Sequence, residues 1–231
     1  MQAAEGQVGR VVEVEGVDKA YGRQRVLDGV DLRVERGERV ALMGPSGSGK
    51  STLLSLLAGL EIPDQGRILV LGEDLAALPE SGKTALRRGR VTSIFQFFHL
   101  LPTLTAAENV EFPLLLARMP AREREARVRK LLEEVGLGDR GAALPEVLSG
   151  GEMQRLAIAR ALITEPALIL ADEPTGSLDS RNSVRILDLL RDLTDRHGTA
   201  LLMATHDPEA AAVCDRILQI RDGRLSGEAA A

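Results

Sequence analysis

Hydrophobic and polar residues alternate near the start of the chain, and this two-residue period predicts short β-strands. The alternating apolar positions are Val12, Val14, Val30, Leu32 and Val34, with turns expected at Gly22 and Gly37. Farther on, Arg39–Met43 is a short apolar run. The leucine-rich segment Ser51–Ala58 ends at Gly59, which is typical of a helix followed by a glycine cap.

The second half of the chain mixes helical and continuous apolar patterns. Apolar residues recur at helical spacing in the charged segment 121–135, and again at Ile186, Leu187, Leu190 and Leu193. Two short uninterrupted apolar runs, 167–171 and 200–204, suit strands that are covered on both faces, as in a parallel sheet. The patterns predict a single α/β domain over residues 1–231, with a helical insertion between roughly Arg87 and Ala161.

The composition is that of an ordinary globular protein of 231 residues, with 44% hydrophobic and 27% charged residues. Aromatic residues make up only 2%, so the core must be built from aliphatic side chains. The formal charge of -5 gives no bulk attraction to nucleic acid, and no nucleic-acid partner is expected. Cys214 is the only cysteine, which excludes an intrachain disulfide and suits a buried apolar residue better than a reactive thiol.

No segment reads as a secretory signal or a membrane span. The first twenty residues lack an apolar core. The longest uncharged stretch, Val91–Ala107, is interrupted by Gln96, His99 and Pro102. We therefore expect a soluble protein whose membrane role, if it has one, comes through a partner.

A phosphate-binding loop is the first chemical motif along the chain. It lies between the predicted strand and the predicted helix and consists of Gly44, Pro45, Ser46, Gly47, Ser48, Gly49, Lys50 and Ser51, with Thr52 following. Glycines let main-chain N–H groups approach phosphate oxygens, Lys50 is expected to reach the β- and γ-phosphates, and Ser51 to bind Mg²⁺. A chance glycine-rich turn is the alternative, but the flanking elements disfavour it. The loop alone predicts only nucleoside triphosphate binding.

An acidic pair, Asp172 and Glu173, ends the apolar run Leu168–Asp172. A carboxylate at the carboxyl end of a strand is placed to join a Mg²⁺ coordination shell, which is the role expected for Asp172. Glu173 could orient and deprotonate an attacking water. On its own such a pair would be explained as the start of a loop, but the phosphate loop favours the catalytic interpretation.

The segment Leu148–Glu152, followed by MQRLAIARAL, resembles the signature of the ABC ATPases. Ser149 could cap a helix whose first turn, with Gly150, Gly151 and Glu152, offers N–H donors to a phosphate. An ordinary capped helix start would look the same locally. The resemblance extends over nearly the whole chain because other motifs of the family follow in order.

Those further motifs take their roles from the resemblance. Tyr21 stands where an aromatic stacks on adenine, and Gln96 where the Q-loop contacts Mg²⁺ and water. Ser177-Leu178-Asp179 looks like the D-loop, and His206 looks like the switch histidine at the γ-phosphate. Each residue alone would be explained as a packed aromatic, a surface amide or a structural histidine.

The resemblance implies a P-loop NTPase core with a mainly parallel sheet, an N-terminal antiparallel β subdomain and an inserted α-helical subdomain. It also implies an ATPase with ATP and Mg²⁺ as cofactors. Two chains would sandwich two ATP molecules head to tail, each site combining one chain's hydrolytic residues with Ser149 and Gly151 of the other. The expected partners are integral membrane permease subunits, and the expected location is the inner face of the cell membrane, on the cytoplasmic side.

Two longer stretches, FQFFHLLPTLTAAENVEFPLLLA and LADEPTGSLDS, are similar to the lipoprotein-release and macrolide-export ATPases. His99 stands where Asn is common in that group, and Met153 occupies a variable place in the signature. The alternatives are a cell-division ATPase or a non-transport ABC protein acting as a mechanical clamp. A GTPase or small-molecule kinase is disfavoured, because no Asn-Lys-x-Asp segment is present and neither class has a use for LSGGE.

All four phenylalanines fall in one window, at Phe95, Phe97, Phe98 and Phe112. They could form the core of the helical insertion or a surface on which a partner docks. In the family, this part of the chain receives the coupling helices of the membrane subunit. Our hypothesis is that Phe97 or Phe98 lines the receiving groove.

Overall fold

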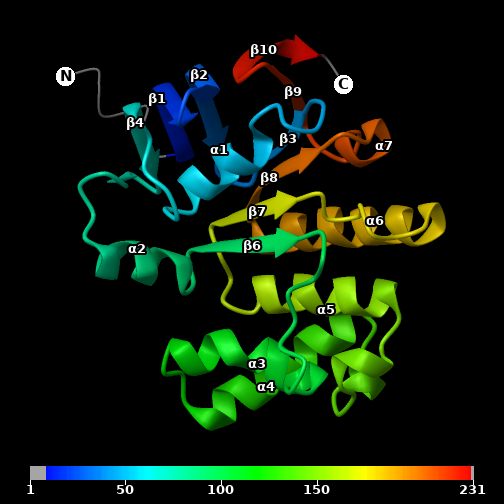
Figure 1. The fold of residues 1–231 in the computed structure, drawn as a ribbon. Coiled ribbons are helices and arrows are strands. Elements are labelled where there is room, and N and C mark those ends of the chain that lie inside the picture. The colour runs from blue at the N-terminus through cyan, green and yellow to red at the C-terminus, as the bar shows by residue number, and fades with distance from the viewer. Residues whose placement is uncertain (1–8, 230–231) are drawn as a thin grey trace.

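The computed structural model of the chain describes residues 9–229 and builds them around two sheets (Figure 1). The first sheet is antiparallel and has the order β2-β1-β4-β5. Its strands are β1 (Arg10–Tyr21), β2 (Gln24–Glu35), β4 (Gln65–Val70) and β5 (Glu73–Asp74). Strands β1 and β2 are longer than the alternation predicted, because β-bulges let each of them continue past the first apolar positions.

The second sheet has six strands in the order β10-β9-β3-β8-β7-β6, and all its neighbours are parallel except β9 and β10. Its strands are β3 (Arg39–Met43), β6 (Val91–Phe95), β7 (Leu168–Asp172), β8 (Ala200–Thr205), β9 (Arg216–Arg221) and β10 (Arg224–Ala229). Every residue of β8 is buried, as expected for a strand covered on both faces. The predicted α/β fold class is confirmed.

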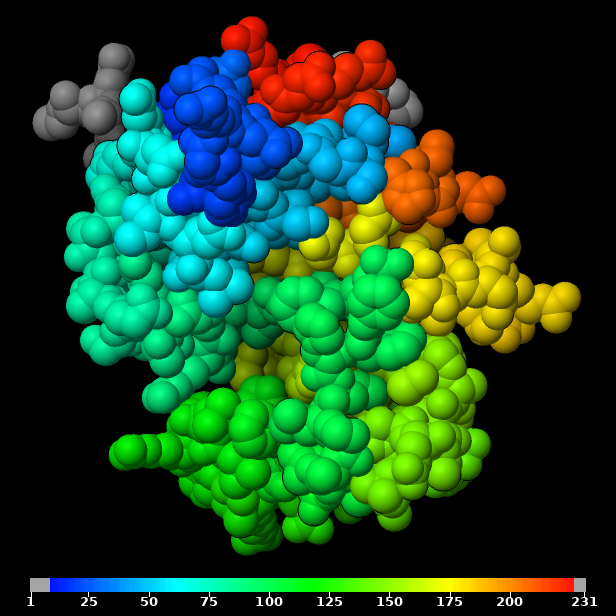
Figure 2. All heavy atoms as spheres, in the orientation of Figure 1, coloured from blue at the N-terminus to red at the C-terminus, as the bar shows by residue number. Residues whose placement is uncertain are grey.

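The helices cover both faces of this sheet and form a lobe at one end of the molecule (Figures 1 and 2). They are α1 (Lys50–Leu57), α2 (Glu80–Arg87), α3 (Ala106–Leu116), α4 (Ala121–Glu134), α5 (Gly150–Leu162), α6 (Ser180–His197) and α7 (Pro208–Ala211), with 3-10 turns η1 (Gly138–Arg140) and η2 (Pro145–Val147). Helix α5 lies between the strands and helices α3 and α4 (Figure 1).

Alternate residues of the parallel strands enter two separate hydrophobic cores. In β8, Leu201 and Met203 pack with helices α3 to α6, whereas Leu202 and Ala204 pack with α1 and the antiparallel sheet. The two cores therefore fix the strand register from both sides, since a slip by one residue would exchange the two faces.

The helical lobe begins later in the chain than the sequence pattern indicated. The expected start near Arg87 coincides with the end of α2, and β6 follows it as an edge strand of the parallel sheet. This strand was not recognised because Thr92 and Ser93 interrupt its apolar pattern. The helices of the lobe run from α3 to α5, and α5 ends at Leu162. Within residues 9–229 no helix combines the length and the hydropathy that a membrane crossing requires.

Candidate functional site

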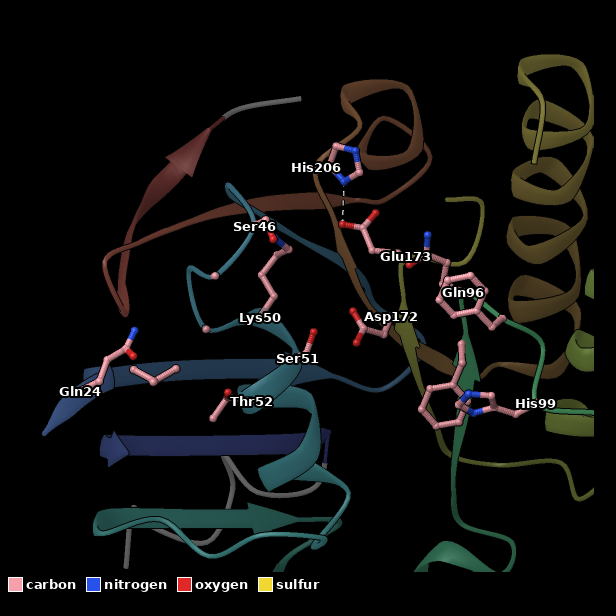
Figure 3. Close-up of a pocket in the computed structure, with 15 residues that line it drawn as sticks. Gln24, Ser46, Lys50, Ser51, Thr52, Gln96, His99, Asp172, Glu173 and His206 are labelled. Atoms are coloured by element: carbon pink, nitrogen blue, oxygen red, sulfur yellow. Dashed lines mark hydrogen bonds and ion pairs between the residues drawn. The ribbon is translucent and has the colours of Figure 1, made fainter. Parts of the chain in front are cut away.

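A cleft of about 660 Å³ opens at the carboxyl ends of strands β3, β6, β7 and β8 (Figure 3). Strand register produces this convergence, because Phe95, Asp172 and Ala204 lie side by side in one row across the sheet. The sequence-predicted residues that line the cleft are Ser46, Gly47, Gly49, Lys50, Ser51, Thr52, Gln96, Asp172, Glu173 and His206. Segments far apart in the sequence are thus brought to one place.

The loop between β3 and α1 has a shape that only glycine permits at two of its positions. A Cβ on Gly44 would lie 2.2 Å from the Ile220 carbonyl oxygen. A Cβ on Gly49 would lie 2.7 Å from the Val26 carbonyl oxygen, and its φ of 106° is unfavourable for other residues. Gly44, Pro45 and Ser48 complete the loop without lining the cleft.

Lys50 is buried at the start of α1, and its ammonium donates to the main-chain carbonyls of Gly44 (2.7 Å) and Pro45 (3.0 Å). No ion pair to a carboxylate is formed by this ammonium within the described part of the chain. A buried cation held only by carbonyls, beside the first N–H groups of a helix, suits a phosphate. The loop residues therefore fit the triphosphate of ATP.

Glu173 and His206 form the polar pair at the centre of the cleft. The Glu173 Oε1 and His206 Nδ1 atoms are 2.8 Å apart (Figure 3). Glu173 has a φ of 49°, a strained conformation for glutamate, and its main-chain N–H donates to the Ala204 carbonyl at 2.9 Å. This bond to the neighbouring strand holds the turn that directs the carboxylate into the cleft.

Gln96 directly follows the end of β6 and lines the cleft. Its carbonyl accepts a hydrogen bond from the Ser177 hydroxyl at 2.8 Å. Its side-chain amide lies against Gly176, where a Cβ would approach Nε2 to 2.9 Å. The glutamine is therefore confined between β6 and the segment after β7.

The donor set fits a Mg²⁺ ion that arrives with phosphates. Ser51, Gln96 and Asp172 supply oxygen atoms around one part of the cleft. No group of three or more His, Cys, Asp or Glu side chains suited to a metal occurs among residues 9–229. Mg²⁺ is normally held by one or two carboxylates together with substrate phosphates and water, so a sparse set of this kind is what it needs.

Tyr21 stands at the edge of the cleft rather than in it. It pairs across the hairpin turn with Gln24, which lines the cleft. The Tyr21 hydroxyl donates to the Glu61 carboxylate, which raises the pKa of the phenol, and the Lys19 ammonium lies 5.5 Å from the ring centroid. The residue is 47% exposed, so the ring is accessible to a planar group that could stack on it.

The signature residues lie apart from the cleft, at the start of α5. Ser149 and Glu152 form a capping box, in which the Ser149 hydroxyl (2.7 Å) and main-chain N–H (2.9 Å) both donate to Glu152 Oε2. These bonds, together with Arg140, lower the pKa of Glu152 from 4.5 to about 2. The predicted cap is therefore present, while Ser149, Gly150, Gly151 and Glu152 do not line the cleft.

Asp179 belongs to the same region as the signature. It caps α6 by accepting from the Asn182 main-chain N–H at 3.0 Å, which lowers the pKa of the Asp179 carboxyl. A Cβ on Gly151 would lie 3.3 Å from Asn182 Oδ1. The start of α5 and the start of α6 therefore form a second cluster, separate from the cleft.

Five residues of the cleft lining were not anticipated from the sequence: Gln24, Val26, Phe95, Phe97 and His99. The first two reach it through the pairing of β1 with β2, for which no local motif exists. None of the four phenylalanines is buried, so they do not form a core.

The hypothesis that Phe97 or Phe98 lines a docking groove stays a prediction. A second groove, of about 510 Å³, lies between α2, β6 and the helical lobe, and Phe95 is the phenylalanine that lines it. Phe97 instead stands at the mouth of the cleft, 69% exposed, because the chain turns after Gln96.

Comparison with known proteins gives concordant matches. The family model described as ABC transporter matches residues 27–176. The lipoprotein-releasing system ATP-binding protein LolD of Pseudomonas syringae pv. tomato is 51% identical over 200 residues, covering 87% of this chain and 88% of its own length. The uncharacterized ABC transporter ATP-binding protein YbbA of Escherichia coli K12 is 47% identical over 223 residues, covering 95% and 98%.

Among solved structures, the dimeric ATP-binding cassette MJ0796 in a post-hydrolysis state bound to ADP and Pi superposes with a TM-score of 0.85. It is 38% identical, and the match covers 94% of this chain and 97% of that one. The fold therefore has a counterpart of known structure over nearly the whole chain.

The capping box gives the first prediction. Because the folded-state pKa of Glu152 lies below 4.5, its charge stabilises the fold above about pH 4.5, and that stabilisation is lost as the pH falls toward 2. We expect Glu152→Gln to lower the free energy of unfolding by about 0.3–1 kcal/mol at neutral pH, because glutamine can keep the capping geometry but loses the charge. The deficit should shrink as urea unfolding is repeated from about pH 5 to about pH 3.

Glu146→Gln, at an exposed carboxylate on the neighbouring 3-10 turn, is the matched control and should leave the pH profile close to wild type. A deficit of Glu152→Gln that stays constant over the whole pH range would contradict the assignment.

Proposed function

This chain belongs to the ABC transporter family of ATP-binding proteins, and we propose that it is the ATP-hydrolysing subunit of a membrane complex of the lipoprotein-release or macrolide-export type. The observation that carries the catalytic part is the cleft itself. Lys50, Asp172 and Glu173 converge there from two strands that neighbour β8. The LolD relatives support the choice of cargo class.

In this proposal the cleft binds ATP by its phosphates. The N–H groups of the glycine loop and Lys50 bind the β- and γ-phosphates, while Ser51, Gln96 and Asp172 hold Mg²⁺. The bound ion neutralises negative charge on the phosphate oxygens. Tyr21 stacks on the adenine at the edge of the cleft.

Glu173 is the proposed general base. Its carboxylate accepts a proton from the attacking water, and Gln96, at the end of the neighbouring strand, orients that water. His206 holds the carboxylate through the 2.8 Å contact, lines the cleft and is the proposed contact to the γ-phosphate. The strained main chain at Glu173 fixes the carboxylate before substrate arrives.

The position of the signature supports a site that is completed by a second chain. Ser149 and Gly151 do not line the cleft of their own chain, yet the exposed start of α5 offers N–H groups to an anion. A head-to-tail pair of chains would place this helix start over the partner's γ-phosphate. The dimeric cassette MJ0796 has the same fold and is the precedent for such a pair.

The base assignment is tested by Glu173→Gln. We expect phosphate release to fall by about 10² to 10⁴-fold, because the amide cannot accept the proton, while ATP binding is retained. Phosphate release and nucleotide titration measure the two effects, and gel filtration with Mg-ATP should detect a trapped dimer. Glu209→Gln, the same change at an exposed residue of α7, is the control. Normal turnover of Glu173→Gln would overturn the assignment.

The groove beside the helical lobe is the proposed docking site for the permease, which would place the chain at the cytoplasmic face of the membrane. Its apolar lining includes Leu60, Phe95 and Leu116, and Leu60 is 61% exposed. Arg87 and Arg88 stand among the lining residues. Arg87 already pairs with Glu80 at 2.9 Å, so an amphipathic helix with an acidic edge would cover the apolar floor and place its charge beside Arg88.

Leu116 and Leu115 offer a matched test of this groove. They are neighbours on α3 with exposed fractions of 46% and 45%, but only Leu116 lines the groove. We expect Leu116→Glu to reduce permease recovery by about tenfold or more, because it places a charge on the apolar floor. Leu115→Glu should leave recovery unchanged, and both changes should keep basal phosphate release when Glu173 is intact.

Recovery is measured by affinity pull-down from solubilised native membranes with Mg-ATP and mass spectrometry, with Glu173→Gln in every bait. A permease with few membrane spans and a large extracytoplasmic domain supports the proposed type. Equal recovery by the two leucine variants would refute the groove assignment. Recovery of ribosomal proteins alone would favour the mechanical-clamp alternative over a transporter.

A further inference from the structure

The chain turns sharply after Gln96, and two consecutive non-glycine residues of the turn lie in the left-handed region. The φ angle is 61° at Phe98 and 48° at His99. Such angles are unfavourable for these side chains because Cβ approaches the following carbonyl. Strain of this kind persists only where surrounding contacts hold the main chain. The turn therefore requires support from outside itself.

Arg160, in the last turn of α5, supplies that support. Its Nη2 donates to the Phe98 carbonyl at 2.8 Å and its Nη1 to the His99 carbonyl at 2.5 Å. The two strained residues are thus the two whose carbonyls are held. The bonds span 61 and 62 residues of sequence, so they are tertiary contacts rather than part of a local turn.

The Arg160 guanidinium has an unusual environment for a cation. It is half-buried, burial lowers its pKa, and no ion pair joins it to a carboxylate in the part of the chain that the structure describes. Burying a charge without a counter-ion is unfavourable unless several hydrogen bonds compensate. The two carbonyls provide that compensation, so the arginine and the strained turn stabilise each other.

The Gln96 end of the same segment is held by the segment that follows β7. The Ser177 hydroxyl donates to the Gln96 carbonyl at 2.8 Å. Main-chain carbonyls at residues 96, 98 and 99 are therefore all fixed by side chains from α5 and from the segment after β7. The segment that carries the Gln96 side chain has little freedom left.

We propose that Arg160 is a positioning residue for Gln96, fixing the turn after it so that the glutamine side chain is presented to the cleft. The proposal rests on the catalytic role proposed above for Gln96. Arg160 itself does not line the nucleotide cleft, so it acts through the turn rather than on the reacting atoms.

This position gives Arg160 a connection to two other regions. It lines the groove proposed for the permease, together with Phe95 and Leu116. It also lies near the opposite end of α5 from Ser149, about 17 Å away along the helix. A shift of α5 or an occupant of the groove would move the two donor groups, and through them the turn that carries Gln96.

The planar fork of arginine is what the two carbonyls require. Guanidinium N–H groups point in fixed directions and can serve two acceptors at once, whereas a lysine ammonium is a point charge at the end of a flexible chain. Arg160→Lys keeps the charge and most of the volume but loses the fixed pair of donors. It is therefore the variant that isolates the geometry.

The test is a double-mutant cycle on the full chain, using Arg160→Lys, Gln96→Ala and the combination. We expect Arg160→Lys to lower kcat for ATP about tenfold, because misplacement of an orienting group costs rate. The KM for ATP should stay within about twofold. With Gln96 already replaced by Ala, Arg160→Lys should change kcat by less than about twofold, since the group it positions is absent.

Arg127→Lys is the matched control, because Arg127 on α4 donates to Glu165 at 3.3 Å and lines neither the cleft nor the groove. It should leave kcat at the wild-type value. Melting temperatures of all variants separate a loss of fold from a loss of positioning. If Arg160→Lys is recovered unfolded, the same cycle with Arg160→Gln, which retains one donor group, gives the decision.

The results test two assignments, the positioning role of Arg160 and the catalytic role of Gln96. A tenfold loss that is equally large with and without Gln96 would overturn the positioning role and leave the function of Gln96 intact. Wild-type kcat in Arg160→Lys would overturn it as well. Wild-type hydrolysis by Gln96→Ala would overturn the role of Gln96 and, with it, the positioning role of Arg160.

Discussion

The register of the parallel strands is the constraint on which the site depends. Phe95, Asp172, Ala204 and Leu42 form one row across β6, β7, β8 and β3. Gln96, Glu173, His206 and the glycine loop all leave the sheet within two residues of that row. A slip of one residue in any strand would exchange its buried faces and carry its functional residue to the wrong side. The two hydrophobic cores that fix this register therefore also fix the catalytic geometry.

Much of this arrangement could be predicted from the sequence, because it is encoded locally. The phosphate loop, the acidic pair at the end of β7 and the Ser149 cap each depend on adjacent residues, and the structure shows each at its expected element. Contacts between distant segments could not be predicted in the same way. Nothing near Arg160 in the sequence indicates that its partners are Phe98 and His99. The polar residues Thr92 and Ser93 interrupt the apolar pattern of β6, so the strand could not be predicted from it. Tertiary pairing carries no short-range signal, which is why the start of the helical lobe could not be predicted from adjacent residues.

Helix α5 carries in one rigid element both the signature residues, at its start, and Arg160, in its last turn. Its first turn, capped by Ser149 and Glu152, faces away from the cleft of its own chain, while Arg160 in its last turn holds the segment that enters that cleft. A helix transmits displacement along its axis with little loss, because each turn is hydrogen-bonded to the next. One chain's cleft and its partner's cleft would then respond to the same movement of α5, as a motor that works as a dimer requires.

Backbone strain is distributed in a way that supports this view. In residues 9–229, Leu71, Arg118, Glu165 and Asp222 adopt positive φ in connections just after or between regular elements, where such angles end a helix or strand. Glu173, directly after β7, and Phe98 and His99, after β6, also follow strands, but these three lie beside the cleft. Glycine would relieve the strain at these positions, but it would remove the Glu173 carboxylate and the His99 ring that packs 4.5 Å from Phe95. The protein keeps side chains at these positions although its backbone is strained there, which indicates that their placement serves function rather than stability.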